Sequence, residues 1–257
     1  MSVPVLHATE PHGTGPLLLL GPSLGTSTIL WEDTLSLLRE HFTVVAWDLP
    51  GHGLSPATTE PFTVEELADA VVAIADELGH REFFYAGDSL SGGVGIAVMQ
   101  GHPHRAIGAA IICSTAKFGT SEGWHERAAL ARTTGTASLV VPSAQRWFAP
   151  DSIARRPVLS GRLLNALREV DDESYALCCE ALAAYDGRPG LGDIATPVDV
   201  IVGQYDIAVP HESSRAVANG IPGAKWIEIP DAAHLVPAEQ PELCARELIA
   251  FFKGANR

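Results

Sequence analysis

The stretch Tyr85-Ala-Gly-Asp-Ser-Leu-Ser-Gly-Gly-Val94 decides how the chain is expected to fold. It begins in a short apolar run, Phe83–Ala86, and leads into a predicted helix, so a strand, a sharp turn and a helix are expected in that order. A serine in such a turn adopts strained backbone angles and leaves no space for large side chains two residues away. The pattern therefore predicts a nucleophile at the carboxyl end of a strand.

Three residues of this stretch could occupy the nucleophile position. Asp88 would place Leu90 two residues away, and leucine is too large for the turn. Ser89 lies between Gly87 and Ser91, and Ser91 is itself the third possibility. Ser89 follows the strand most closely and is predicted to be the nucleophile. Ser91 stands where a second glycine is expected, and its hydroxymethyl group either crowds the turn or forms a local hydrogen bond.

Short apolar runs recur along the chain and alternate with helical patterns, which is the rhythm of a parallel sheet covered on both faces. The runs outside the turn are Pro16–Leu20, Thr43–Trp47, Ala109–Ile112, Thr196–Val202 and Ala224–Ile229. Thr63 and Glu66 form a capping-box pattern before an amphipathic helix. After Ser114, about 75 residues show helical periodicity without a strand pattern. We therefore expect an α/β core at residues 1–116 and 190–257, with a helical cap inserted at residues 117–189.

Length and charge limit the classes of protein to be considered. A chain of 257 residues is long enough for one α/β core with an insertion. Its 17 Lys and Arg against 31 Asp and Glu give a net charge of −14, which disfavours nucleic acids and anionic membranes as partners. The segment Met1–Gly15 has neither a basic leader nor a long apolar stretch, so no signal peptide or membrane anchor is expected, and the cytoplasm is the predicted compartment.

The cysteines and the glycines give no sign of a metal or a cofactor. None of the four cysteines forms a C-x-x-C pair, and Cys178 and Cys179 are adjacent, so free thiols are expected. No His/Cys/Asp cluster has metal-ligand spacing, and no phosphate-binding glycine pattern follows the first strand. We therefore expect no metal and no cofactor.

A serine nucleophile needs a histidine to accept its proton and a carboxylate to orient that histidine. On this kind of scaffold the chain order is serine, acid, histidine. Asp206 follows the strand pattern ending at Val202, and His234 follows the one ending at Ile229, so both are predicted at strand carboxyl ends. Asp199 lies within a strand pattern, and Asp231 remains an alternative acid in a D-x-x-H pair. The histidines expected on the surface are His52, His80, His102, His104 and His211.

Catalysis also needs N–H donors directed at the developing oxyanion. One is expected from the backbone of Leu90, directly after the nucleophile. The second is expected from the loop Gly21–Gly25, where Pro22 has no N–H and the N–H of Leu24 is the candidate.

The segment Trp47-Asp-Leu-Pro-Gly-His-Gly-Leu-Ser55, taken with the turn at Ser89 and the Asp206 and His234 loops, resembles the α/β-hydrolase superfamily over essentially the whole chain. The resemblance implies an eight-stranded, mostly parallel sheet flanked by helices, with an inserted helical cap. More narrowly, the chain is similar to the 3-oxoadipate enol-lactonases of the β-ketoadipate pathway of aromatic breakdown. The stretches that carry this likeness are Leu20–Thr26, Cys113–Gly119, Trp124–Arg127, Arg146–Phe148 and Cys178–Ala184. The chain departs from the family at Ser91, where a glycine is usual, and at Leu49-Pro50.

The narrower resemblance implies a small anionic lactone or ester as substrate. Cap cations could bind its carboxylate through bidentate hydrogen bonds, or could simply lie on solvated helix surfaces. The candidate cations are Lys117, Arg127, Arg132 and Arg146. The candidate apolar contacts, which could instead hold the cap helices together, are Trp124, Trp147 and Phe148.

Other functions fit parts of the same pattern. Gly87-Asp-Ser-Leu90 with Asp231 and His234 is also typical of GDSL-type esterases, but that family places the nucleophile near its N-terminus. A general carboxylesterase, a cofactor-free perhydrolase and a C–C bond hydrolase share the scaffold, because a fold does not fix a substrate. A non-catalytic ligand receptor is the alternative from a different class. Labelling of Ser89 by a fluorophosphonate separates an enzyme from a receptor. No oligomeric state is predicted.

Overall fold

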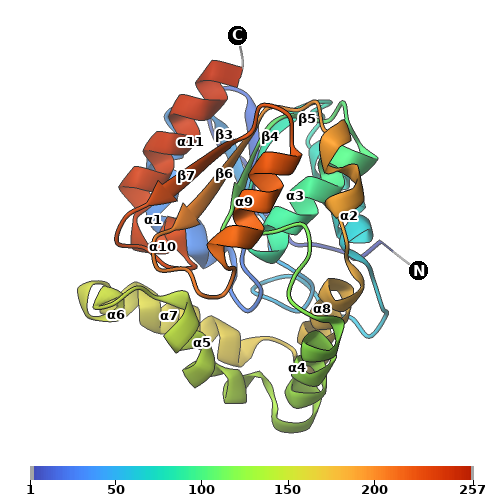
Figure 1. The fold of residues 1–257 in the computed structure, drawn as a ribbon, viewed down its shortest axis with the longest axis vertical. Helices are drawn as coiled ribbons and strands as arrows, with labels where there is room; N and C mark the ends of the chain where they lie inside the picture. Colours follow the sequence, from blue (N-terminus) through green and yellow to red (C-terminus); the bar gives the residue numbers. More distant parts are fainter. Residues whose placement is uncertain (1–2, 256–257) are drawn as a thin grey trace.

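A mixed sheet of seven strands forms the centre of the molecule in a computed structural model that describes residues 3–255 (Figure 1). The strand order is β1-β3-β2-β4-β5-β6-β7, and every neighbouring pair is parallel except β1 with β3. The strands are β1 (His12–Gly13), β2 (Leu17–Gly21), β3 (Thr43–Ala46), β4 (Phe83–Asp88), β5 (Ala106–Ile112), β6 (Val198–Gly203) and β7 (Lys225–Ile229).

Helices cover both faces of this sheet. On one face α1 (Glu32–Leu38) packs against α11 (Pro241–Ala255), next to the short α10 (Val236–Glu239). On the other face lie α2 (Val64–Glu77), α3 (Leu90–Gly101) and α9 (His211–Gly220) (Figure 1). A 3₁₀ turn, η1 (Thr28–Trp31), leads into α1.

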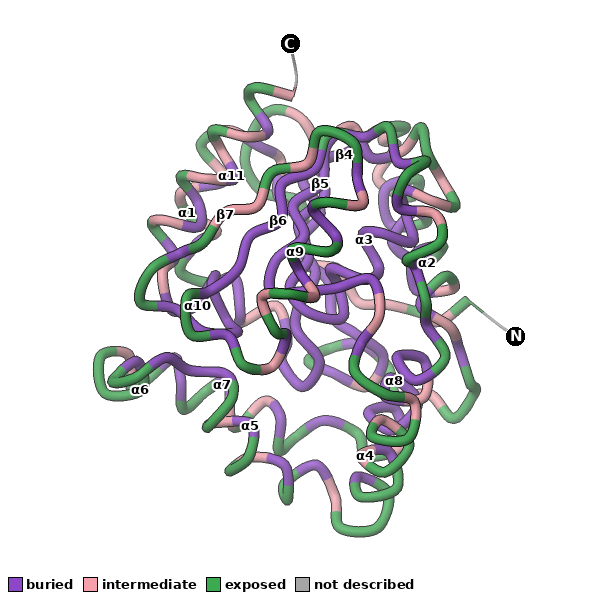
Figure 2. The backbone as a smooth tube through the Cα atoms, viewed as in Figure 1, coloured by how far each residue is buried: buried purple, intermediate pink, exposed green. Residues whose placement is uncertain are grey.

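The central strands are buried on both sides, which explains their continuous apolar sequence. Every residue of β2, β4 and β6 is buried, as the purple tube at the centre of Figure 2 shows. Strands sandwiched between two helical layers have no solvent face, so their side chains do not alternate between apolar and polar. The expected α/β fold, a mostly parallel sheet flanked by helices, is confirmed.

The start of α2 confirms the capping box read from the sequence. The Thr63 hydroxyl accepts a hydrogen bond from the Glu66 N–H at 3.1 Å, and the Glu66 carboxylate accepts one from the Thr63 N–H at 2.9 Å. Two of the N–H groups that a helix start leaves unpaired are therefore satisfied. The buried face of α2 then packs against α3.

The expectation of eight strands is wrong for the described residues, which form seven. The N-terminal segment does run antiparallel to the end of β3, with a single bridge between Ala8 and Trp47 and a hydrogen bond from the Asp48 N–H to the His7 carbonyl. Pro11 lies between this bridge and β1, and proline has no N–H to continue a ladder. The edge pairing is therefore split into a bridge and a two-residue strand.

Between β5 and β6 the chain forms only helices. They are α4 (Ser121–Thr134), η2 (Thr136–Leu139), α5 (Val140–Trp147), α6 (Ser152–Arg155), α7 (Pro157–Glu169), α8 (Asp172–Ala184) and η3 (Arg188–Asp193). Helices α4 to α8 lie across the carboxyl ends of the strands, whereas η3 packs against α3 and α9 of the core (Figure 1). Helices α4 and α8 make the most extensive contact. We keep the name cap for residues 117–189, which hold α4 to α8.

The four cysteines are free, as expected, and all four are buried. Across residues 3–255, no helix is both long enough and apolar enough to span a bilayer.

Candidate active site

Ser89 occupies a strained turn between β4 and α3. Its φ of 56° and ψ of −118° lie outside the regions that a serine ordinarily adopts. A Cβ on Gly87 would overlap the Ser91 carbonyl, so glycine is required two residues before the serine. Ser89 donates its N–H to the Ile112 carbonyl at 2.8 Å and accepts the Ser114 hydroxyl at 2.5 Å. The turn is thus fixed on both sides by β5 and its following loop.

Ser91 forms a long-range hydrogen bond and does not crowd the turn. Its hydroxyl donates to the Pro22 carbonyl at 2.5 Å, 69 residues away in the sequence. The Ser91 side chain has space for this contact because residue 21 is a glycine, and a Cβ at that position would collide with it. The departure from the usual glycine therefore ties the start of α3 to the loop after β2.

His234 and Asp206 form a buried pair. Asp206 accepts from His234 Nδ1, with distances of 3.1 and 3.0 Å to its two carboxylate oxygens. Burial raises the pKa of Asp206, but the charge and hydrogen bond of His234 and the N–H groups of Ala208 and Val209 outweigh it, so the pKa lies below its usual value. The ionised carboxylate holds a proton on Nδ1 and leaves Nε2 as the basic nitrogen of the ring.

The other two acids considered for this place do not contact His234. Asp199 lies inside β6. Asp231 is exposed and adopts a positive φ of 53°. The backbone of Asp231 is held by Gln204 and Gln240. Of the three candidates, only Asp206 reaches the imidazole.

The expectation that His52 lies on the surface is wrong. The ring is fully buried, Nδ1 donates to the Pro50 carbonyl at 2.8 Å, and Nε2 accepts the Gly25 N–H at 3.1 Å. Burial lowers the pKa of His52 to about 4, so the ring is neutral and can accept this bond. His52 thereby supports the loop after β2 next to Leu24. The Pro-Gly-His-Gly turn places it inward, which a count of local polarity could not reveal.

The two predicted oxyanion donors are unengaged. Among residues 3–255, neither the Leu24 N–H nor the Leu90 N–H has a hydrogen-bond acceptor. Leu90 is the first residue of α3, where helical geometry leaves the N–H free. Leu24 lines the same cavity as Ser89.

Ser89 and His234 share one cavity beneath the cap. Its volume is about 50 Å³. Its walls are Ser23, Leu24, Ser89, Phe118, Trp124, Arg127, Ser143, Arg146, Trp147, Ala208, Val209 and His234. Ser89 and His234 come from loops of the core, whereas the two tryptophans and the two arginines come from α4 and α5. We call this space the inner chamber.

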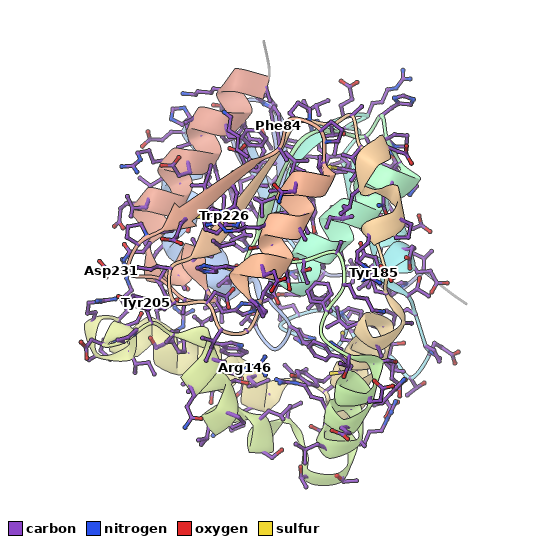
Figure 3. All side chains as sticks on the ribbon, viewed as in Figure 1. Phe84, Arg146, Tyr185, Tyr205, Trp226 and Asp231 are labelled. Carbon is purple, nitrogen blue, oxygen red and sulfur yellow. The ribbon has the colours of Figure 1, made fainter. Side chains whose placement is uncertain are left out.

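Two arginines of the inner chamber lack acidic partners. The Arg127 Nε donates to the Tyr175 hydroxyl at 2.8 Å, and its guanidinium lies over the rings of Trp124 and Tyr175. Neither Arg127 nor Arg146 forms an ion pair with a carboxylate of residues 3–255. Desolvation and the positive charge of Arg127 lower the pKa of Arg146, although part of its side chain reaches solvent. Figure 3 shows Arg146 where the cap meets the core.

Three other cap residues predicted to contact substrate lie elsewhere. Arg132 is ion-paired with Glu173 and Glu180 on the exposed side of α4 and α8 and does not reach the inner chamber. Lys117 lines only the space outside that chamber. Phe148 is buried edge-on against Trp147 and holds the cap together. Trp124 and Trp147 do line the inner chamber.

Sequence reasoning missed several residues of the site. Ser23, Phe118, Ser143 and Val209 also line the inner chamber, and the buried Ser143 hydroxyl has no partner among the described residues. No local pattern distinguishes these positions. Glu239 did leave a signal, because it is a lone acid within the buried apolar run that begins at Ala232.

Glu239 links the cap to the loop that carries His234. One carboxylate oxygen accepts the Ala149 N–H at 2.7 Å and the other accepts the Ala233 N–H at 2.8 Å. Beside this clamp the His234 N–H donates to the Trp147 carbonyl at 3.1 Å. Burial raises the pKa of Glu239, against the opposing effect of these N–H groups. These hydrogen bonds fix the position of the loop that carries His234 relative to the end of α5.

One cluster of three possible metal ligands occurs among the described residues: Cys113, Asp206 and His234. Burial raises the pKa of the Cys113 thiol well above its usual value, and its Sγ donates to the Ala233 carbonyl at 3.5 Å. An ion there would also compete with the hydrogen bond between Asp206 and His234. The cluster therefore suits proton transfer better than metal binding.

Asp88, directly before Ser89, is fully buried and both of its carboxyl oxygens lack hydrogen-bond partners. Desolvation, followed by the negative charges of Asp206 and Glu239, raises its pKa well above the usual value. The carboxyl group is therefore held in its neutral form.

We expect Asp88→Asn to stabilise the protein relative to the wild type by an amount that grows with pH. The unfolded carboxyl ionises above about pH 4, whereas the folded one stays protonated, so wild-type stability decreases as pH rises. Asparagine binds no proton, and the difference should grow by up to about 1.4 kcal/mol per pH unit. Urea unfolding of both proteins at pH 4, 5.5 and 7 measures it. A difference that is independent of pH would show that Asp88 is ionised in the folded state.

Glu239→Gln should lower the free energy of unfolding by about 1–3 kcal/mol, because an amide nitrogen would face a buried N–H donor and leave it unpaired. It should also reduce turnover, since the His234 loop loses its support. Glu242→Gln is the matched control, because that side chain is 74% exposed at the start of α11. Urea denaturation and ester hydrolysis check both effects. Equal losses in the two variants would contradict a clamp at Glu239.

Residues 16–241 match the protein family described as having the α/β hydrolase fold. It is 30% identical to 3-oxoadipate enol-lactonase 2 of Acinetobacter baylyi over 250 residues, which covers 97% of this chain and 93% of that protein. It is 32% identical to the crystal structure of the enol-lactonase from Burkholderia xenovorans, with a TM-score of 0.92 and 96% of each chain covered.

A thermophilic esterase from Thermogutta terrifontis, solved with malate bound, is 25% identical with a TM-score of 0.93, covering 98% of this chain and 94% of the esterase. The enol-lactonases and the esterase act on ester or lactone bonds, the chemistry for which an activated serine is suited. The chain therefore belongs to the 3-oxoadipate enol-lactonase family of the α/β-hydrolase superfamily and is a hydrolase of ester or lactone bonds.

Proposed function

We propose that the protein opens a small anionic enol-lactone, 3-oxoadipate enol-lactone, to give 3-oxoadipate, through an acyl-enzyme on Ser89. The observation that carries the proposal is the pair Arg127 and Arg146 in the chamber that also holds Ser89 and His234, without an acidic partner among residues 3–255. Two converging guanidinium groups repel each other, and a substrate carboxylate would relieve that repulsion through bidentate hydrogen bonds. The names of the two enol-lactonase relatives agree with this substrate class.

The proposed reaction has two steps. His234 Nε2 takes the proton of the Ser89 hydroxyl, whose oxygen attacks the lactone carbonyl, and the N–H groups of Leu24 and Leu90 stabilise the oxyanion. The carbonyl-to-ring-oxygen bond then breaks, and the enolate oxygen that leaves takes the proton from His234. Asp206 stabilises the imidazolium that forms between these transfers.

Hydrolysis of the acyl-enzyme completes the cycle. His234 now removes a proton from water, which attacks the acyl carbonyl and releases Ser89 with its proton restored. The enol product tautomerises to the ketone of 3-oxoadipate. Because the leaving group stays tethered to the acyl chain, its protonation prevents the ring from closing again. A carboxylate held by Arg127 and Arg146 would keep the whole chain oriented during both steps.

Ser89→Ala and His234→Ala should each lower kcat by about 10³-fold or more without unfolding the protein. Asp206→Asn should also lower it severely, because an amide cannot stabilise the imidazolium. Asp231→Asn is the matched control and should have little effect. Ultraviolet-monitored lactone hydrolysis, with fluorophosphonate labelling of the wild-type serine, measures these outcomes. A larger effect at Asp231 than at Asp206 would favour the GDSL-type mechanism instead.

Arg146→Gln should lower kcat/KM for the anionic lactone by about 1.5–3 kcal/mol, the contribution of one charge-assisted hydrogen bond. Hydrolysis of p-nitrophenyl acetate should stay nearly unchanged, because that ester has no carboxylate. Arg127→Gln should behave similarly, with an added loss from the Tyr175 contact. Arg132→Gln is the control, since Arg132 is paired with glutamates outside the chamber. Equal losses on both substrates would mean that these arginines support the cap and do not recognise the carboxylate.

A further inference from the structure

A second, larger space continues outward from the inner chamber. It has a volume of about 470 Å³, against about 50 Å³ for the inner chamber. Both spaces are lined by Phe118, Trp124, Arg127, Arg146, Ala208 and Val209. Since these residues form a shared boundary, the two spaces are parts of one cleft. We call the larger part the outer chamber.

The inner chamber is too small to hold a whole substrate. A single water needs about 10–15 Å³ measured in the same way, so the inner chamber has room for only a few such groups. A reacting carbonyl and its nearest atoms would fill it, so the rest of a larger substrate would extend past Arg127 and Arg146. The outer chamber, in contrast, falls in the range of about 300–1,000 Å³ that is usual for pockets binding small ligands.

The lining of the outer chamber as a whole is mostly apolar by area, and Thr115, Thr120 and Ser213 add hydroxyl groups to it. Its apolar residues outside the shared boundary are Leu130 on α4, Leu139 in η2, Pro142 on α5 and Pro210 before α9. Lys117 and Glu126 are the charged residues on the same walls, and neither is ion-paired within residues 3–255. Leu130 is 42% exposed on this wall, so its side chain is accessible to a ligand in the outer chamber.

We propose that the outer chamber is a subsite for an apolar group of the substrate, an alkyl or aryl extension beyond the reacting ester. This widens the substrate class from a six-carbon lactone to esters and lactones that carry such an extension. The proposal rests on the proposed function only in taking Ser89 as the nucleophile. It does not depend on the identity of the lactone.

Burial of each methylene of a substrate chain should raise kcat/KM by up to about fourfold, because transfer of apolar surface out of water lowers the free energy of the bound transition state. Over the four methylenes between butanoyl and octanoyl esters, partial burial should give at least about a tenfold increase. An ester chain that stayed in solvent would give no increase in kcat/KM with its length.

The test compares p-nitrophenyl esters of acetate, butanoate, hexanoate and octanoate below their micellar concentrations, each normalised to its hydroxide-catalysed rate. A second series, from ethyl to octyl acetate followed by pH-stat, places the extension on the alcohol side. Leu130→Glu introduces a charge into the wall of the outer chamber, at a side chain that is partly exposed to solvent. Val141→Glu is the matched control, because Val141 is 68% exposed nearby on α5 but lines neither chamber.

We expect kcat/KM to rise with chain length in at least one series. Leu130→Glu should remove most of that rise while leaving p-nitrophenyl acetate within about twofold, and Val141→Glu should change neither. Pro142 is also exposed and lines the outer chamber, so Pro142→Glu provides a second variant should Leu130→Glu fail to fold. A rate independent of chain length in both series would overturn the proposal, as would equal effects of the Leu130 and Val141 variants.

The same measurements separate this proposal from the lactonase proposal. A rise with chain length in a protein that does not open the enol-lactone supports the outer subsite and rejects the lactone. Lactone hydrolysis without any rise supports the lactone and rejects the subsite. Ser89→Ala should abolish every rate in both series, and rates that persist would reject the nucleophile on which both proposals depend.

Discussion

The positive φ of Ser89 is the constraint on which the arrangement of the site depends. Backbone strain of this kind costs about 1–3 kcal/mol and persists only where neighbouring contacts fix it. Here Gly87 provides the space, Ile112 and Ser114 bind the two peptide groups of the serine, and Tyr85 donates its hydroxyl to the Ser91 carbonyl at 2.8 Å. These contacts come from β4, β5 and α3, so the buried sheet itself holds the nucleophile in place.

The same sheet aligns the remaining groups because they follow parallel strands. Loops after β2, β4, β6 and β7 carry Leu24, Ser89, Asp206 and His234, and parallel strands end at one edge. Two links then join this edge to the cap. His52 binds the loop after β2 and stacks on Tyr175, which accepts a hydrogen bond from Arg127, while Glu239 joins the His234 loop to the end of α5.

Local patterns predicted what depends on neighbouring residues in the chain. The strand-turn-helix at Ser89, the capping box at Thr63 and the strands ending before Asp206 and His234 all follow from short stretches of sequence. Contacts between distant segments were not predictable in this way. Arg127 and Arg132 lie five residues apart on α4 and were equivalent candidates. Arg127 faces the inner chamber, whereas Arg132 is ion-paired with two glutamates of α8, because five residues of helix turn the two side chains to different sides. His52 was misplaced for the same reason, since its partner Gly25 is 27 residues away.

The arginine pair is best explained by considering the charge of the whole molecule. With a net charge of −14, the protein repels an anion at long range, and seven of the thirteen arginines within residues 3–255 are ion-paired with carboxylates. Leaving Arg127 and Arg146 without such partners costs stability, because like charges in a partly desolvated cleft repel each other. A fold selected only for stability would pair or replace them. Their position between the inner chamber and the larger outer chamber agrees with our proposal that they bind a substrate carboxylate while an apolar extension occupies the outer chamber.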